Sequence, residues 1–250
     1  HLIYTERVAG SSPAPSIMNI SIIYQDNNIV AVNKPAGVAV HKGVAEKGET
    51  LADWLAEKFP EMKKVGDEPE LRPGIVHRLD KDTSGVLVAA RNQKSFEFLK
   101  KQFQNRSIVK KYLALVEGNL KTDKGAIDLP IGRSQNDFRK KLASSVARGE
   151  LREAVTEYKV LEKFPDYTLV EVYPKTGRTH QIRVHFKAIG HPIVCDSLYG
   201  GKRMTCPFGL KRHFLHSNFL EFDSPSGARL KLEADLPEDL SQVLARLRKK

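Results

Sequence analysis

Residues 73–85 hold the densest group of reactive and turn-forming side chains in the chain. Within this segment, Asp80 is flanked by His77, Arg78 and Lys81. Nearby cations keep a carboxylate ionised, and an ionised carboxylate is available as a nucleophile. The segment lies between a Pro-Gly turn and an apolar run, a setting in which a rigid scaffold can hold a functional loop.

Both aspartates of this segment have an alternative role as turn caps, which is common for aspartate. We favour that role for Asp82, because it is followed by Thr-Ser-Gly. The local sequence leaves the role of Asp80 open.

A second polar cluster spans residues 176–186. If this segment is helical, Arg178, Gln181 and His185 lie near one face. Arg183 cannot lose its charge, so it is a durable partner for a carboxylate or a phosphate.

Histidines in and around this cluster do not have the spacing of a metal site. His180, His185 and His191 are five and six residues apart, whereas two imidazoles share one helical face at a spacing of four. His213 and His216 lack nearby acidic or cysteine partners. We expect no metal site, and histidines that lie in the core or face RNA.

The charge balance points to a polyanionic partner. The chain has 41 Lys and Arg against 30 Asp and Glu, a formal net charge of +11. Neutralising phosphates releases condensed counterions, so such an excess attracts nucleic acid, although it can also serve solubility alone. Because the basic pairs are scattered along the chain, we expect a basic surface on a folded domain.

The composition also suggests where the protein works. The longest apolar runs are too short to span a bilayer, and no secretion signal is evident at the start of the sequence. Cys195 and Cys206 are too few for a disulfide framework or a four-ligand zinc site. We therefore expect a cytoplasmic protein with reduced cysteines and no membrane contact.

The segments that would position these clusters have sequence patterns typical of strands, with a few typical of helices. Strands outnumber helices and do not alternate regularly with them, which favours an α+β fold with a mixed or antiparallel sheet. Thr50 and Asn92 are expected N-caps, and Pro237 suits the first helical position. The expected strands are 20–24, 29–33, 86–90, 111–116, 156–161, 168–173, 214–222 and 228–233, and the expected helices are 51–59, one after Asn92 and one from Pro237.

The two clusters resemble the two signatures of RluA-type pseudouridine synthases, namely residues 77–85 (HRLDKDTSG) and 177–185 (GRTHQIRVH). Further segments follow in the family's order: 33–37 (NKPAG) with Val40 and His41, 110–118 (KKYLALVEG), 190–193 (GHPI) with Asp196, Tyr199 and Gly200, and 214–217 (FLHS). The resemblance covers about residues 19–240, and the agreement of several ordered motifs is highly specific.

The resemblance implies a fold and an organisation. The expected fold is a mixed, mainly antiparallel curved sheet with flanking helices and a central basic cleft. Residues 19–250 would form one catalytic domain. Many members of the family carry a small RNA-binding domain before it, but residues 1–18 are too few to form one, so we expect them to be an unstructured or non-native extension. We expect a monomer.

The resemblance also implies an activity. Members of this family convert a uridine in RNA to pseudouridine, which requires no metal, nucleotide or redox cofactor. Asp80 would be the essential catalytic residue on the ribose side, and Arg183 would pair with it. Tyr112 would lie against the uracil ring and relay a proton, its alternative being a core aromatic.

The same resemblance implies that further residues bind the substrate. Leu215 would pack on the other side of the base, and Arg78 would fill the space left by a flipped uridine. Basic residues within 132–152 would grip the RNA backbone, or else form an ordinary surface loop. The remaining candidates for substrate binding are Lys111, Arg133, Lys140, Arg178, His180 and Gln181.

Three questions about function stay open in the sequence. Large-subunit ribosomal RNA is the favoured substrate, with transfer RNA as the alternative. A non-catalytic RNA-binding or ribosome-assembly protein on the same fold is a rival, although such a protein would be expected to lose Asp80, Tyr112 or Arg183. A glycoside hydrolase would need a second carboxylate, and these clusters offer only Asp82.

Overall fold

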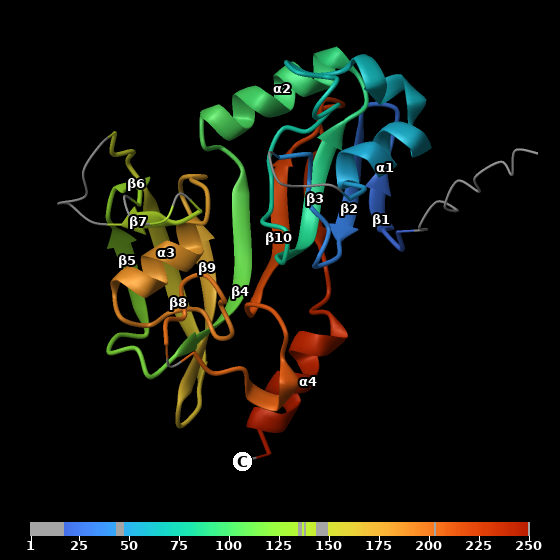
Figure 1. Ribbon diagram of the computed structural model, residues 1–250. Coiled ribbons are helices and arrows are strands. Elements are labelled where there is room, and N and C mark those ends of the chain that lie inside the picture. The colour runs from blue at the N-terminus through green and yellow to red at the C-terminus, as the bar shows by residue number, and fades with distance from the viewer. Residues whose placement is uncertain are drawn as a thin grey trace, which may run out of the picture.

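Strands from both halves of the chain join in one large twisted sheet (Figure 1). The computed structural model describes residues 18–43, 48–134, 137, 139–143, 150–202 and 204–249. Of the expected N-terminal extension, only Met18 is therefore described. Within the described residues the strand order is β1 (Ser21–Gln25), β2 (Ile29–Lys34), β3 (Ser84–Ala90), β10 (Leu215–Asp223), β4 (Val109–Glu117), β9 (Tyr167–Pro174), β8 (Val155–Lys163) and β5 (Lys124–Asp128), with β11 (Arg229–Glu233) paired to β10.

Neighbouring strands are antiparallel except at the contact of β3 with β10, which is parallel. Ser84 lies opposite His216 and Gly85 opposite Ser217 at this contact. Gly85 has a φ of 120°, and a Cβ there would lie 2.1 Å from the carbonyl oxygen of Ser217. A glycine is therefore required for the loop before β3 to meet the start of β10.

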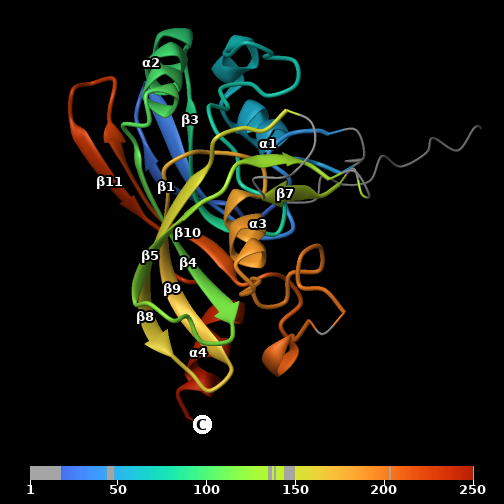
Figure 2. The same cartoon turned by 90° about the vertical axis from the view of Figure 1, so that its left-hand side faces the viewer.

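Successive side chains of a strand point to opposite faces of the sheet, so apolar residues lie on both faces. The four α-helices of the described chain pack against these residues. On β2 and β3, Val30, Val32 and Leu87 pack with α1 (Leu51–Lys58), whereas Ile29 and Val86 pack with α2 (Gln93–Gln104). On β4, Ala114 and Val116 pack with α3 (Gln181–Ala188), and Leu115 packs with α4 (Glu238–Leu247). Figure 2 shows α1 and α3 on the same side of the sheet.

Short elements complete the architecture. They are the 3₁₀ helices η1 (Pro60–Lys64) and η2 (Pro207–Gly209) and the two-stranded sheet of β6 (Ile131–Arg133) and β7 (Lys141–Ala143). The β6–β7 hairpin projects beside α3 (Figure 2). The prediction of an α+β fold with a mixed, mainly antiparallel sheet is confirmed.

Local signals located helix starts to within one residue, since Pro237, expected at the first helical position, is the N-cap of α4. Thr50 caps α1 with a reciprocal pair of hydrogen bonds to Asp53, and Asn92 accepts from the backbone N–H of Ser95 at the start of α2. Within residues 176–186, which were considered as a possible helix, the helix begins only at Gln181, so Arg178 lies in the turn before it. The strands β5, β6 and β7 were not predicted, since their short apolar runs are weak signals.

The expectation of reduced cysteines is wrong for this structure, in which Cys195 and Cys206 form a disulfide. The backbone N–H of Cys195 donates to the carbonyl oxygen of Thr205, which brings the two ends of this loop together. The Cα atoms of Cys195 and Cys206 are 4.7 Å apart. That separation lies in the range of disulfide-bonded pairs. Within the described residues, no helix combines the length and the apolar character needed to cross a bilayer.

Candidate active site

A cavity of about 530 Å³ opens where the loop before β3 meets β4, β10 and α3. Both predicted clusters contribute to its lining, together with one face of α2. Eight of the predicted site residues line it: Arg78, Asp80, Tyr112, Arg178, His180, Gln181, Arg183 and Leu215. Further cations that the sequence analysis did not single out also line it: Arg72, Lys100, Arg106, Lys110 and Lys175.

The loop that carries Asp80 is anchored by a buried lysine. Lys34 is fully buried, and its Nζ donates to the carbonyl oxygens of Pro35, Val38 and Lys81 at 2.8, 2.8 and 3.0 Å. Burial lowers the pKa of Lys34 to about 7, although the charge of Asp80 raises it. Three acceptors match the three donors of an ammonium, so Lys34 ties the end of β2 to the loop beside Asp80.

Lys34 belongs to the NKPAG segment of residues 33–37, but no role was predicted for it from the sequence. Its signal was a lysine two residues after the apolar run of residues 29–32.

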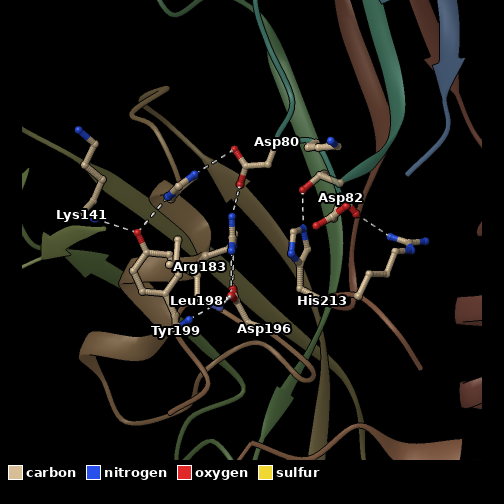
Figure 3. Close-up of polar contacts among 12 residues, drawn as sticks. Asp80, Asp82, Lys141, Arg183, Asp196, Leu198, Tyr199 and His213 are labelled. Atoms are coloured by element: carbon tan, nitrogen blue, oxygen red, sulfur yellow. Dashed lines mark hydrogen bonds and ion pairs between the residues drawn. The ribbon is translucent and has the colours of Figure 1, made fainter. Parts of the chain in front are cut away.

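Arg183 on α3 joins two carboxylates (Figure 3). Its Nη1 donates to Asp80 Oδ2 at 2.9 Å, so the expected pairing is present in the structure. Its Nε and Nη2 donate to the two oxygens of Asp196 at 2.7 and 2.8 Å, a bidentate contact. Asp196 is fully buried and also accepts from the backbone N–H groups of Leu198 and Tyr199, which fixes the fork of Arg183.

Asp80 is held in its ionised form. Burial by itself would raise its pKa, but the charge of His180 when that ring is protonated, and the charge and hydrogen bond of Arg183, outweigh burial and leave the pKa below its usual value. Burial in turn lowers the pKa of His180, which favours its neutral form. The side chain remains 17% exposed toward the cavity. An ionised carboxylate is thus available at the cavity surface at neutral pH.

Tyr112 on β4 faces the same cavity. Burial raises the pKa of Tyr112 to about 12, while a hydrogen bond with Ser217 acts in the opposite direction. Leu215 is buried and lies opposite Ala114, two residues beyond Tyr112 on β4. The cavity therefore presents a neutral phenol and an aliphatic side chain close to the ionised carboxylate.

Arg78 and Arg178 line the cavity and have different hydrogen-bond partners. Arg78 is exposed, and its Nη1 lies 3.4 Å from His41 Nε2. Nε of Arg178 donates to the carbonyl oxygen of Glu153 at 3.1 Å. Both guanidinium groups are accessible to an anionic ligand.

Gln181 lines the cavity but uses its amide inside the protein. The amide oxygen accepts from Thr176 Oγ1 and the backbone N–H of Arg178, and the amide nitrogen donates to Val155 and Thr156. This side chain shapes the turn that leads into α3.

Three predicted substrate-binding residues lie outside the cavity lining: Lys111, Arg133 and Lys140. Because side chains alternate along a strand, Lys111 points away from the Tyr112 face, and its Nζ lies 4.0 Å from Glu171 and 4.7 Å from the ring centre of Phe219. Lys110 lines the cavity in its place. Arg133 ends β6, and Lys140 precedes β7.

The histidines of β10 and the residues before it have partners within the protein. His213 Nε2 lies 2.8 Å from Thr83 Oγ1, and His216 Nδ1 lies 2.9 Å from Ser84 Oγ. In the described part of the chain, no group of three or more His, Cys, Asp and Glu side chains is placed to hold a metal ion.

The chain is similar to known proteins of one family. Residues 28–188 match the family model described as RNA pseudouridylate synthase. The chain is 42% identical over 233 residues to the Uncharacterized RNA pseudouridine synthase YlyB of Bacillus subtilis (strain 168), covering 93% of this chain and 74% of that protein. It is 40% identical over 224 residues to Ribosomal large subunit pseudouridine synthase D of Borreliella burgdorferi, covering 90% of this chain and 67% of that protein.

A solved structure is similar throughout. Human RNA Pseudouridylate Synthase Domain Containing 4 superposes with a TM-score of 0.72 at 28% sequence identity. The match covers 91% of this chain and 92% of the human one.

Proposed function

Since this chain belongs to the RNA pseudouridine synthase family, whose members are isomerases, we propose that it converts a uridine of large-subunit ribosomal RNA to pseudouridine. The observation that carries this proposal is the ionised Asp80, held by Arg183 at the surface of a cation-lined cavity. A relative at 40% identity bears the name of a large-subunit ribosomal RNA enzyme, which supports the choice of RNA.

The target uridine would enter the cavity by leaving its stack in the RNA. A volume of about 530 Å³ is within the range of small-ligand sites. Arg78, exposed at the mouth, would occupy the space that the base vacates, because a planar cation can stack there and still contact phosphate. Arg178 and Lys110 would contact the backbone of the RNA.

Asp80 would act on the ribose side while the glycosidic bond breaks, with Oδ2 held by Arg183 and Oδ1 turned toward the substrate. Tyr112 and Leu215 would enclose the uracil so that it can turn before it is rejoined through carbon-5. A phenol that stays protonated up to a pH of about 12 suits proton donation or relay near the base. No group is consumed by an isomerisation, so the site needs no co-substrate.

The test maps pseudouridine in total RNA from a strain lacking the gene, complemented with wild type, Asp80→Asn or Asp82→Asn. We expect one or more sites to vanish on deletion, to return with wild type and Asp82→Asn, and to stay absent with Asp80→Asn. Asp82 is the matched control because it is an exposed aspartate two residues away that does not line the cavity. In vitro, Asp80→Asn should lower the rate about 10³-fold or more while RNA binding persists.

The same map separates the alternatives. A site in transfer RNA would replace the ribosomal assignment. Restoration by Asp80→Asn, or binding without any modified site, would favour the non-catalytic RNA-binding role.

A further inference from the structure

Tyr199 lies beneath the candidate active site and hydrogen bonds in two directions (Figure 3). It is buried, and its hydroxyl lies 2.9 Å from the backbone nitrogen of Lys141 and 3.0 Å from His180 Nδ1. A backbone N–H can only donate, so the phenolic oxygen accepts from Lys141. Because the side chain is buried, its phenolic proton also needs an acceptor, and among the described residues the other hydrogen-bond contact of the hydroxyl is His180 Nδ1, which can accept it.

This donation determines which nitrogen of His180 carries a proton. If Nδ1 accepts from Tyr199, the neutral ring carries its hydrogen on Nε2. Nε2 is the atom that lies 3.9 Å from Asp80 Oδ1. An N–H dipole directed toward a carboxylate is favourable, whereas a lone pair there would be repelled, so both neighbours select the same tautomer.

The backbone at His180 shows that its position must be held by its contacts. His180 precedes α3 with a φ of 57°, in the left-handed region of backbone conformation that residues other than glycine rarely adopt. Such a conformation persists only where surrounding contacts offset its cost. The bond to Tyr199 supplies one of these contacts directly to the ring.

Tyr199 also supports the other oxygen of Asp80. Its backbone N–H donates to Asp196 Oδ1 at 3.1 Å, and the guanidinium carbon of Arg183 lies 5.2 Å from the centre of its ring. Arg183 in turn holds Asp80 Oδ2. One residue therefore contacts both groups that face the carboxylate.

We propose that Tyr199 is a positioning residue for the isomerisation: it aims His180 Nε2–H at Asp80 Oδ1 and couples that alignment to the β6–β7 hairpin through Lys141. This inference rests on the proposed function, because it assigns Asp80 to the chemistry. Its consequence is that the hairpin carrying Arg133 and neighbouring Lys140 is linked by two hydrogen bonds to a ring 3.9 Å from the carboxylate.

Tyr199→Phe removes only the hydroxyl and is the first test. On an RNA fragment containing the mapped uridine, we expect kcat to fall about 10- to 100-fold with KM within about twofold of wild type, because the reacting groups lose alignment rather than affinity. Tyr158→Phe is the control: Tyr158 is also buried and loses a hydroxyl contact, to Thr122, but it lies outside the cavity lining. A kcat of Tyr199→Phe within twofold of Tyr158→Phe, or a change in KM alone, would overturn the proposal.

Variants at His180 test the coupling. His180→Gln keeps an N–H donor near the place of Nε2 without needing Tyr199, so it should retain more activity than His180→Ala. Adding Tyr199→Phe to either His180 variant should change kcat less than about twofold, since the partner is already gone. Independent, multiplicative losses would contradict the link, and this comparison remains informative if Tyr199→Phe alone folds poorly.

Amide exchange separates this inference from the proposed function. In Tyr199→Phe the Lys141 N–H loses its acceptor and should exchange about 10-fold faster or more, whereas Tyr158→Phe should leave it unchanged. Faster exchange with no RNA modified even by the wild type would reject the proposed function but keep the hydrogen-bonded link. Unchanged exchange would reject the link itself.

Discussion

At the scale of single residues, the site depends on one guanidinium shared by two carboxylates. Arg183 is buried, and Asp196 is fully buried. Taking such charges out of water is costly unless geometry and additional hydrogen bonds compensate, and here both oxygens of Asp196 are used by Arg183. Asp196 thus fixes the guanidinium, which leaves Nη1 to orient Asp80.

Arg183→Lys tests this arrangement, since an ammonium cannot reproduce a planar fork. We expect kcat to fall about 100-fold and the free energy of unfolding to fall by about 3 kcal/mol, because a buried carboxylate is left short of donors. Single-turnover kinetics and urea denaturation measure the two effects.

Arg229→Lys is the matched control for this variant. Arg229 also contacts two carboxylates, Glu221 and Asp223, but its side chain is 39% exposed. We expect about 1 kcal/mol of destabilisation or less, since exposed ion pairs contribute little. Equal effects of the two substitutions would show that the buried fork has no special role.

At the scale of elements, the site depends on the parallel contact between β3 and β10. This contact joins the loop that carries Asp80 to the strand that carries Leu215. Hydrogen-bonded side chains reinforce it, including Ser84 with His216. The close approach at Gly85 sets the distance between the two strands.

Gly85→Ala should therefore separate the strands. A Cβ would clash with the Ser217 carbonyl oxygen, and a φ of 120° disfavours any side chain. We expect a loss of about 3 kcal/mol or more in the free energy of unfolding.

Gly177→Ala is the control, because nothing lies within 4 Å of its added Cβ. That variant should stay within about 1 kcal/mol of wild type. Thermal and chemical denaturation of both variants check the contrast, and tolerance of Gly85→Ala would contradict the strand geometry.

At the scale of the whole molecule, buried histidines make the fold sensitive to acid. Burial and, to a lesser extent, the charge of Arg183 lower the pKa of His213 to about 4. Burial also lowers the pKa values of His185 and His216. An unfolded histidine binds its proton near pH 6.5, so between these values the unfolded chain binds more protons and acid favours unfolding.

His213→Gln should reduce this sensitivity. For wild type, the free energy of unfolding should decrease as pH falls from 7 to 5, and His213 should account for about 2 kcal/mol of that decrease. The variant should therefore lose about 2 kcal/mol less over the same interval, as measured by urea denaturation at both pH values.

Thr83→Val serves as the control, because it removes the hydrogen-bond partner of His213 but not the titrating group. It should lower stability by a similar amount at pH 7 and pH 5. An identical acid response in wild type and His213→Gln would exclude His213 as a source of the effect.

The sequence by itself determined the features that depend on nearby residues. Thr50 and Asn92 cap helices through bonds that span three residues, so their signals are local. The ordered motifs identified the family, and Asp80 stood out by its charged neighbours. The β-rich runs predicted most strands of the sheet, whereas its mixed, mainly antiparallel character was implied by the family resemblance.

Only the tertiary structure decided which distant residues meet. Asp196 and Tyr199 belong to the site because they hydrogen bond to Arg183 and His180, respectively, across intervening loops. Lys34 belongs to it because its Nζ donates to a carbonyl oxygen 47 residues away. Lys111 and Lys110 are equivalent as sequence, and only the position of the core assigns one of them to the cavity. Cys195 and Cys206 likewise pair because a loop closes between them. Local propensity acts over a few residues, whereas burial and long-range hydrogen bonds arise only when the whole sheet assembles.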